Sequence, residues 1–166
     1  PEFKDYSRQV VLNCQALADQ LSSVYKYTLA TGGTENHLIL WDLKPQNLTG
    51  SKMQTICDFC AITLNKNAVL GDKSALTPGG VRIGTPALTT RGLKESDFRQ
   101  VADFLHQAVQ IALRLQESSG KLLKDFENAL ENSAEAKELK KSVQTFITQF
   151  PMPGFDTATM KYKTIE

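Results

Sequence analysis

One stretch decides the fold of this chain: Gly79-Gly80-Val81-Arg82-Ile83-Gly84-Thr85-Pro86. Val81 and Ile83 favour a β-strand, while the glycines before them and Pro86 after them limit its length. Because successive side chains of a strand alternate between its two faces, we expect Arg82 to point away from its two apolar neighbours. The stretch therefore predicts a short strand over residues 81–85 that presents one arginine.

The position of Arg82 leaves two interpretations open. A charge on a partly buried strand needs an anionic partner, because removing it unpaired from water is expensive. That partner is either an Asp or Glu of the same domain or a bound ligand, and the planar guanidinium matches a carboxylate through two parallel hydrogen bonds. The sequence pattern alone slightly favours the internal ion pair.

The segments around this strand predict a small α/β domain. Residues 36–43 resemble a second strand, apolar on both faces and therefore covered by helices. Apolar side chains recur at helical spacing over four segments: 3–25, 51–64, 94–119 and 122–150, the last with a weak break at Asn132-Ser133. Residues 65–67 should end the second helix, and the turn-forming residues 68–80 should cross the surface as a loop. This order of elements predicts helices packed on a short sheet.

Composition narrows the classes of function. The chain has 166 residues with 41% hydrophobic and 22% charged residues, a balance typical of one globular domain. Nineteen Lys and Arg against eighteen Asp and Glu leave a net charge of +1. This charge is too small to attract nucleic acid electrostatically. Apolar runs are only a few residues long, far short of the roughly 20 residues that a membrane span needs.

Cysteine spacing gives a weak signal for a metal or redox site. Cys57 and Cys60 form a C-x-x-C pair, but no second pair follows, and His37 and His106 lie far apart. We therefore expect Cys57 and Cys60 to line the core as small hydrophobic residues and no metal site. His37 is interpreted as a hydrogen-bonded structural imidazole.

Asn67 is the second candidate binding residue. An asparagine on a loop after a helix usually makes only local turn hydrogen bonds, so a ligand contact is the less favoured interpretation from the residue alone. Lys66 and Lys73 are potential amine nucleophiles, but both lie in polar sequence, and an activated lysine needs an apolar or cationic pocket. They are expected to be solvated.

Four stretches together resemble the C-terminal part of serine hydroxymethyltransferases, particularly the eukaryotic ones. The central motif comprises Asn65-Lys66-Asn67 and residues 71–92, from Gly71-Asp72-Lys73-Ser74 to Thr90-Arg91-Gly92. The other three are residues 1–11, resembling a helix that joins the family's two domains, Gly32-Gly33-Thr34-Glu35-Asn36 with the strand after it, and Phe150-Pro151-Met152-Pro153-Gly154. The resemblance covers nearly the whole chain.

The resemblance implies the small C-terminal domain of an aspartate aminotransferase-like, fold type I enzyme that uses pyridoxal phosphate. Residues 1–28 would form the interdomain helix and residues 29–166 the small domain. Such enzymes interconvert serine and glycine while tetrahydrofolate carries the one-carbon unit. By motif, Arg82 matches the arginine that binds the amino-acid carboxylate, Asn67 the asparagine that hydrogen-bonds folate, and Arg91 a supporting arginine.

The same resemblance implies that this chain holds only part of the active site. The Schiff-base lysine, the aspartate facing the pyridine nitrogen, the phosphate-binding loops and the acid/base glutamate should all lie upstream, so no catalytic residue is expected here. Since the chain opens with Pro1, we interpret it as a fragment or processed product that is inactive alone. The parent should be a homodimer or homotetramer, in the cytoplasm by preference, with mitochondrial or plastid locations open.

An alternative function belongs to a different class. Without a preceding large domain, the amphipathic helix over residues 3–25 would expose an apolar stripe, and such surfaces bind partners. The chain would then be a non-catalytic module that acts by association.

Overall fold

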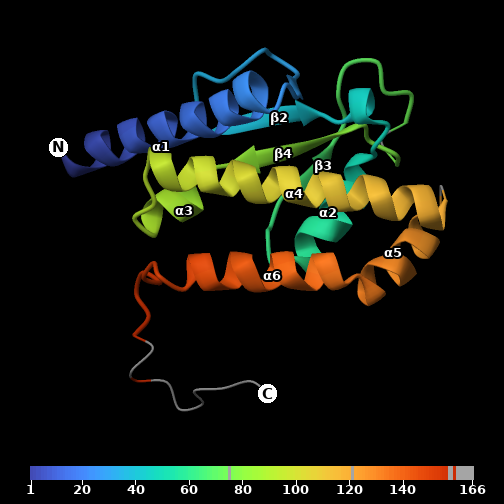
Figure 1. Ribbon diagram of the computed structural model, residues 1–166. Helices are drawn as coiled ribbons and strands as arrows, with labels where there is room; N and C mark the ends of the chain where they lie inside the picture. Colours follow the sequence, from blue (N-terminus) through green and yellow to red (C-terminus); the bar gives the residue numbers. More distant parts are fainter. Residues whose placement is uncertain (75, 121, 157–158, 160–166) are drawn as a thin grey trace.

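The computed structural model describes residues 1–74, 76–120, 122–156 and 159, and Figure 1 shows their arrangement. A small sheet of four strands lies on one side of the molecule. The strands are β1 (Thr28–Leu29), β2 (Leu38–Asp42), β3 (Asn65–Asn67) and β4 (Gly80–Gly84), in the spatial order β1-β2-β4-β3. Every neighbouring pair is antiparallel, which is consistent with the predicted α/β architecture of helices packed on a short sheet.

The helices lie in the four predicted segments, except for α3, which the sequence pattern did not predict. They are α1 (Glu2–Asp19), α2 (Gly50–Phe59), α3 (Pro86–Thr90), α4 (Glu95–Ser119), α5 (Leu123–Asn132) and α6 (Ala134–Ile147). α1 continues through one π-helical segment, η1 (Gln20–Val24), so the predicted helix over 3–25 has a changed hydrogen-bond period at its end. A 3₁₀ turn, η2 (Lys44–Gln46), follows β2.

Caps explain where three of these helices begin or end. Thr49 Oγ1 accepts a hydrogen bond from the backbone N–H of Lys52 and starts α2, and Ser133 does the same for Ala136 at the start of α6. Gly120 ends α4 with a φ of +86°, a conformation that favours glycine. The predicted break at Asn132-Ser133 is therefore confirmed, with Ser133 as the cap.

The prediction for residues 60–67 is wrong. α2 stops at Phe59 instead of Leu64, because Ala61 adopts a φ of +61° and turns the chain away from the helix. Residues 65–67 are not a helix terminator but the edge strand β3, paired with β4. This polar segment has low β propensity, and only the ladder offered by β4 makes it a strand.

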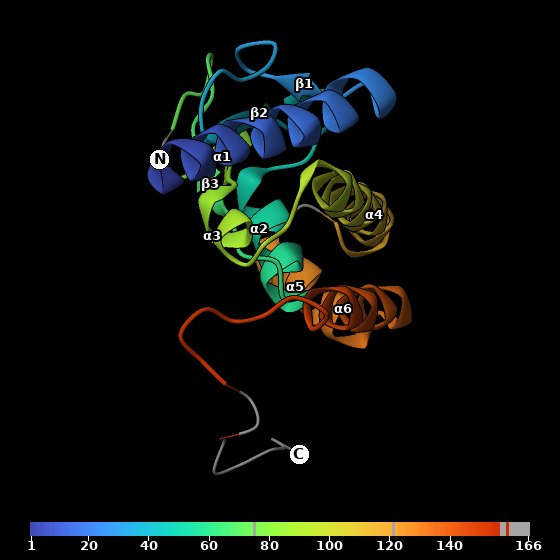
Figure 2. The ribbon, with the colours of Figure 1, turned by 90° about the vertical axis from the view of Figure 1, so that its left-hand side faces the viewer.

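The core lies between one face of the sheet and the helices. Ile39, Trp41, Val81 and Ile83 are buried on that face against α1, α2 and α4. Leu38 and Leu40, on the other face of β2, are only half-buried, so the expectation that both faces are fully covered is wrong. Figure 2 shows α5 and α6 on the side of α2 and α4 that faces away from the sheet.

The three cysteines are reduced and buried, which confirms the core interpretation for Cys57 and Cys60. Burial raises the pKa of the Cys60 thiol to about 11 and that of Cys57 well above its ordinary value. Within the described part of the chain, no group of three or more His, Cys, Asp or Glu is placed to hold a metal ion. No described helix is long and apolar enough to cross a membrane.

Candidate functional site

Arg82 lies in the middle of β4 and points away from the core. Val81 and Ile83 on either side are buried, whereas Arg82 is exposed, which confirms the predicted alternation. Its guanidinium makes no hydrogen bond or ion pair with any other described residue. No described acid forms the internal ion pair that the sequence pattern slightly favoured, and the exposed guanidinium keeps its contact with water.

The strand register brings Asn67 and Arg82 to the same face of the sheet. Asn65 is paired with Arg82, and Asn67 with Gly80, in the antiparallel ladder of β3 and β4. Because residues two apart on a strand share a face, Asn67 and Arg82 are diagonal neighbours, a relation that separates residues by about 7–8 Å. The two candidate binding residues therefore belong to one surface.

Both neighbours of Arg82 on its face of β4 are glycines. The strand positions that share its face, Gly80 and Gly84, carry no side chain. Across the ladder, β2 places Leu40 opposite Arg82. Val69 covers Gly80, so the strand is open towards Gly84, where an added Cβ would meet no atom closer than 3.7 Å.

Asn67 lies at the end of an edge strand, not in the predicted loop. Its side chain is half-buried, and its Nδ2 donates to the carbonyl of Ala68 at 2.8 Å. This bond is the local hydrogen bond that the sequence favoured. The amide oxygen Oδ1 has no partner among the described residues, which leaves it available to a ligand donor.

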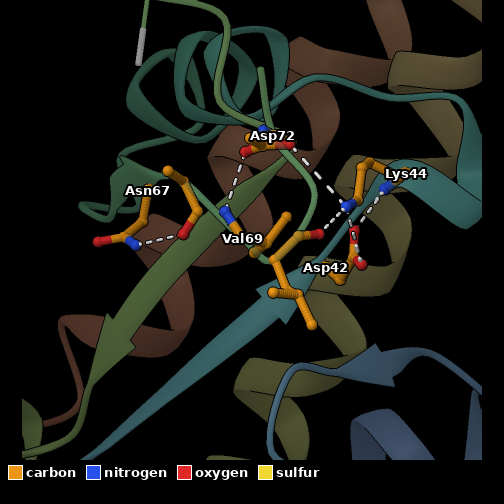
Figure 3. A network of polar contacts seen from close by, with 8 residues as sticks. Asp42, Lys44, Asn67, Val69 and Asp72 are labelled. Atoms are coloured by element: carbon orange, nitrogen blue, oxygen red, sulfur yellow. Dashed lines mark hydrogen bonds and ion pairs between the residues drawn. The ribbon is translucent and has the colours of Figure 1, made fainter. Parts of the chain in front are cut away.

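A polar network that sequence reasoning missed holds the connection from β3 to β4 (Figure 3). Asp72 Oδ2 accepts the backbone N–H groups of Val69 at 2.9 Å and Gly79 at 2.8 Å. Lys44 Nζ lies 3.9 Å from the other carboxylate oxygen, Asp72 Oδ1, and 3.7 Å from Asp42 Oδ2, and it donates to the carbonyl of Leu70. The two backbone hydrogen bonds, with a smaller contribution from Lys44, lower the pKa of Asp72.

Arg91 is committed to the main chain. Its Nη2 donates to the carbonyls of Ile147 at 2.7 Å and Phe150 at 2.9 Å, and its Nε donates to Pro151 at 3.1 Å. These carbonyls lie at and just beyond the end of α6, where orphaned acceptors gather. In this chain the arginine ties the segment after α6 to the end of α3.

The lysines and histidines have structural surroundings. Lys66 and Lys73 are exposed, as expected. The missed buried lysine, Lys52, donates to Gln116 Oε1 at 2.8 Å and to the carbonyl of Gly120 at 3.0 Å, and desolvation lowers its pKa. The prediction for His37 is wrong: its imidazole is exposed, and among the described residues only its carbonyl accepts hydrogen bonds, from Thr85.

His106, not His37, is the histidine with an ordered imidazole. It stacks on Tyr25 with ring centroids 3.9 Å apart and hydrogen-bonds the Tyr27 hydroxyl at 2.8 Å. Desolvation lowers its pKa, so the neutral imidazole is favoured.

An apolar pocket lies next to β4, with Ile83, Gly84 and Arg91 among its lining residues. It has a volume of about 630 Å³ and lies between α3, α4 and α6. Neither Arg82 nor Asn67 lines it. The two candidate residues thus form an open half-site on the sheet, which needs another surface to become a cleft.

The serine hydroxymethyltransferase family model matches residues 1–105. Serine hydroxymethyltransferase 4 from Arabidopsis thaliana is 54% identical over 98% of the chain and 34% of its own length. The chloroplastic serine hydroxymethyltransferase 3 of that plant is 48% identical over 93% of the chain and 30% of its length, and the cytosolic enzyme of Oryctolagus cuniculus is 43% identical over 93% and 33%. The chain spans about a third of the length of these curated relatives, and it belongs to the serine hydroxymethyltransferase family.

Proposed function

We propose that this chain is the small C-terminal domain of a fold type I serine hydroxymethyltransferase. The parent would convert serine and tetrahydrofolate to glycine and methylenetetrahydrofolate. Residues 1–28 would join the two domains, and residues 29–166 would form the small domain. Family membership and the helices packed on a small antiparallel sheet support this assignment. The parent is proposed to be a homodimer or homotetramer, and its location in the cytoplasm stays a proposal.

One observation carries the proposed role of this chain: the exposed guanidinium of Arg82, with no partner among the described residues, on a glycine-flanked strand. A guanidinium of this kind binds a carboxylate in a fixed plane through two hydrogen bonds. Holding the carboxylate of serine or glycine fixes the orientation of the bond that must break at the reacting carbon. Arg82 is therefore assigned to substrate binding.

Asn67 is assigned to folate. Its unpartnered Oδ1 can accept hydrogen bonds from the amino and ring N–H groups of a pterin. Its place on the same face as Arg82 would bring the folate ring near the bound amino acid. Arg91 keeps a supporting role, because its guanidinium is already bonded to three carbonyls.

Pyridoxal phosphate supplies an electron sink to such a reaction. The described residues of this chain do not form a site for it, because no described lysine combines an accessible amine with an apolar or cationic pocket. Lys52 is buried but bonded to Gln116 and Gly120, while Lys66 and Lys73 are exposed in polar surroundings. We assign the cofactor site to the remainder of the parent enzyme and expect the isolated chain to be inactive.

The test uses the full-length parent enzyme. Arg82→Ala should weaken serine binding by roughly 2–5 kcal/mol, as for other lost charge pairs, and leave the cofactor absorbance intact. Asn67→Ala should weaken folate binding and change serine binding little. Arg114→Ala is the matched control, since that arginine pairs with Glu135 on the helical side. Unchanged serine affinity in Arg82→Ala would show that Arg82 does not bind substrate.

The exposed apolar stripe expected along residues 3–25 is mostly buried, because Val10, Cys14, Leu17 and Leu21 pack within this chain. The second candidate function therefore rests on the two ends of that segment. Phe3 is 79% exposed and Val24 is 56% exposed. In a chain that exists by itself, these side chains would favour association with a partner. The parent reading frame distinguishes the two functions. An upstream stretch with the Schiff-base lysine supports the enzyme, whereas a start codon just before Pro1 supports the association module.

A further inference from the structure

The connection from β3 to β4 links the two proposed binding residues. Its first limb, residues 68–72, and its second limb, residues 78–79, are held by different interactions. The limb before β4 is bonded to the body of the domain through the main chain. The carbonyl of Gly79 accepts from Leu43 N–H at 2.9 Å, and the carbonyl of Pro78 accepts from Gly50 N–H at 2.8 Å. A side chain at Gly50 would collide with the Gly80 carbonyl, so this limb is packed closely on α2. Asp72 also accepts the Gly79 N–H, but the two main-chain bonds to Leu43 and Gly50 hold this limb whether or not that carboxylate is present.

The limb after β3, residues 68–72, depends on two charged side chains. Asp72 Oδ2 binds Val69 N–H from this limb and Gly79 N–H from the other, so one carboxylate oxygen joins them. Lys44 adds a donor to the carbonyl of Leu70 and stands between Asp72 and Asp42 (Figure 3). These contacts connect the limb to the end of β2.

Val69 connects the Asp72 carboxylate to the surface that carries Asn67 and Arg82. A Cβ built on Gly80 would lie 2.5 Å from Val69 Cγ1, so Val69 packs directly over Gly80. Gly80 is the ladder partner of Asn67 and shares a face with Arg82. The position of Val69, and with it the chain direction just after Asn67, follows from the hydrogen bond that Asp72 accepts.

We propose that Asp72, with Lys44, is a positioning residue for folate: it fixes the limb after Asn67 and thereby aims the Asn67 amide. The inference rests on the proposed function. It distinguishes the two substrates, because Arg82 is held by the ladders of β4 with β2 and β3, and the limb before β4 has its own main-chain bonds. Loss of Asp72 should therefore disturb folate binding much more than serine binding.

Steady-state and binding measurements on the full-length enzyme test this difference. Asp72→Ala should raise the KM for tetrahydrofolate about tenfold or more, since displacing a binding group by about 1 Å has effects of this size. The dissociation constant of serine should change by no more than about twofold on the same reasoning. Asp72→Asn, which keeps an oxygen for both N–H groups but loses the charge facing Lys44, should restore much of the folate affinity.

Two further variants keep the test decisive. Lys44→Met removes the cation while keeping the aliphatic stem, and it should raise the folate KM even if Asp72→Ala does not fold. Asp97→Ala is the matched control, because Asp97 Oδ2 also accepts a backbone N–H, that of Lys94 at 2.8 Å, but at the start of α4. It should lower the melting temperature without changing either substrate constant.

The outcomes separate this inference from the proposed function. If Asn67→Ala weakens folate binding while Asp72→Ala and Lys44→Met do not, the positioning role is refuted and the proposed folate contact stands. Equal losses of folate and serine affinity in Asp72→Ala would refute it too, since they indicate general disorder of the sheet. If Asn67→Ala itself leaves folate binding unchanged, the proposed contact fails and the positioning role fails with it.

Discussion

Arg91→Ala should destabilise the chain by about 2–3 kcal/mol. The guanidinium donates three hydrogen bonds, to the carbonyls of Ile147, Phe150 and Pro151. A bond from a charged donor contributes about 1.5–3 kcal/mol when well buried, and roughly 1 kcal/mol each is appropriate for this half-exposed side chain. The cation also lies near the negative end of α6, a smaller favourable contribution. The corresponding fall in melting temperature is roughly 4–12 °C for a domain of this size.

Urea unfolding followed by circular dichroism measures this loss, with two comparison variants. Arg114→Ala removes an arginine whose bridge to Glu135 has both side chains more than half exposed, at 54% and 59%, so it should cost no more than about 1 kcal/mol. Arg91→Lys keeps the charge but loses the planar fork and should show most of the loss of Arg91→Ala. If Arg91→Ala costs no more than Arg114→Ala, the three carbonyl contacts do not hold the segment after α6, and the reasoning is refuted.

Two further predictions concern titrating groups. The three buried thiols, whose pKa values are raised by desolvation, should resist iodoacetamide at about pH 8 and react once urea unfolds the chain; rapid labelling of the native protein would contradict their burial. Asp72 has a lowered pKa in the folded state, so its ionised form contributes stability above the ordinary value of 3.8 and loses it as the pH falls through the folded pKa. Asp72→Asn should therefore be less stable than the wild type at neutral pH, with a difference that shrinks in acid; a difference that grows there would reverse the assigned sign.

Periodicity predicted the long elements because their burial follows directly from spacing. An apolar repeat and the glycine at its end were enough to predict the helix over 94–119, and the capping residue Ser133 was enough to predict the break before α6. β3 could not be found in this way. Its residues are polar, and they form a strand only because β4, distant in sequence, offers an unpaired edge.

For the candidate site too, local sequence patterns predicted one feature, and tertiary packing decided the others. Alternation along a strand predicted that Arg82 would point away from Val81 and Ile83. Whether a distant acid reaches it was decided by tertiary packing, and no described acid does. The network of Asp72 and Lys44 was also missed, because a Gly71-Asp72 pair reads only as a turn until the fold brings Lys44 and Gly79 beside it.

The sequence by itself determined the family, through a motif long enough to be specific, and the long helices with the strands β2 and β4, because both depend on residues close together in the chain. Only the tertiary structure decided that Asn67 and Arg82 share one face, that Arg82 is free among the described residues, and that Arg91 is engaged by the end of α6. These three features depend on contacts between segments that are distant in sequence. Such contacts follow from the free energy of packing the whole chain, which local sequence patterns do not encode.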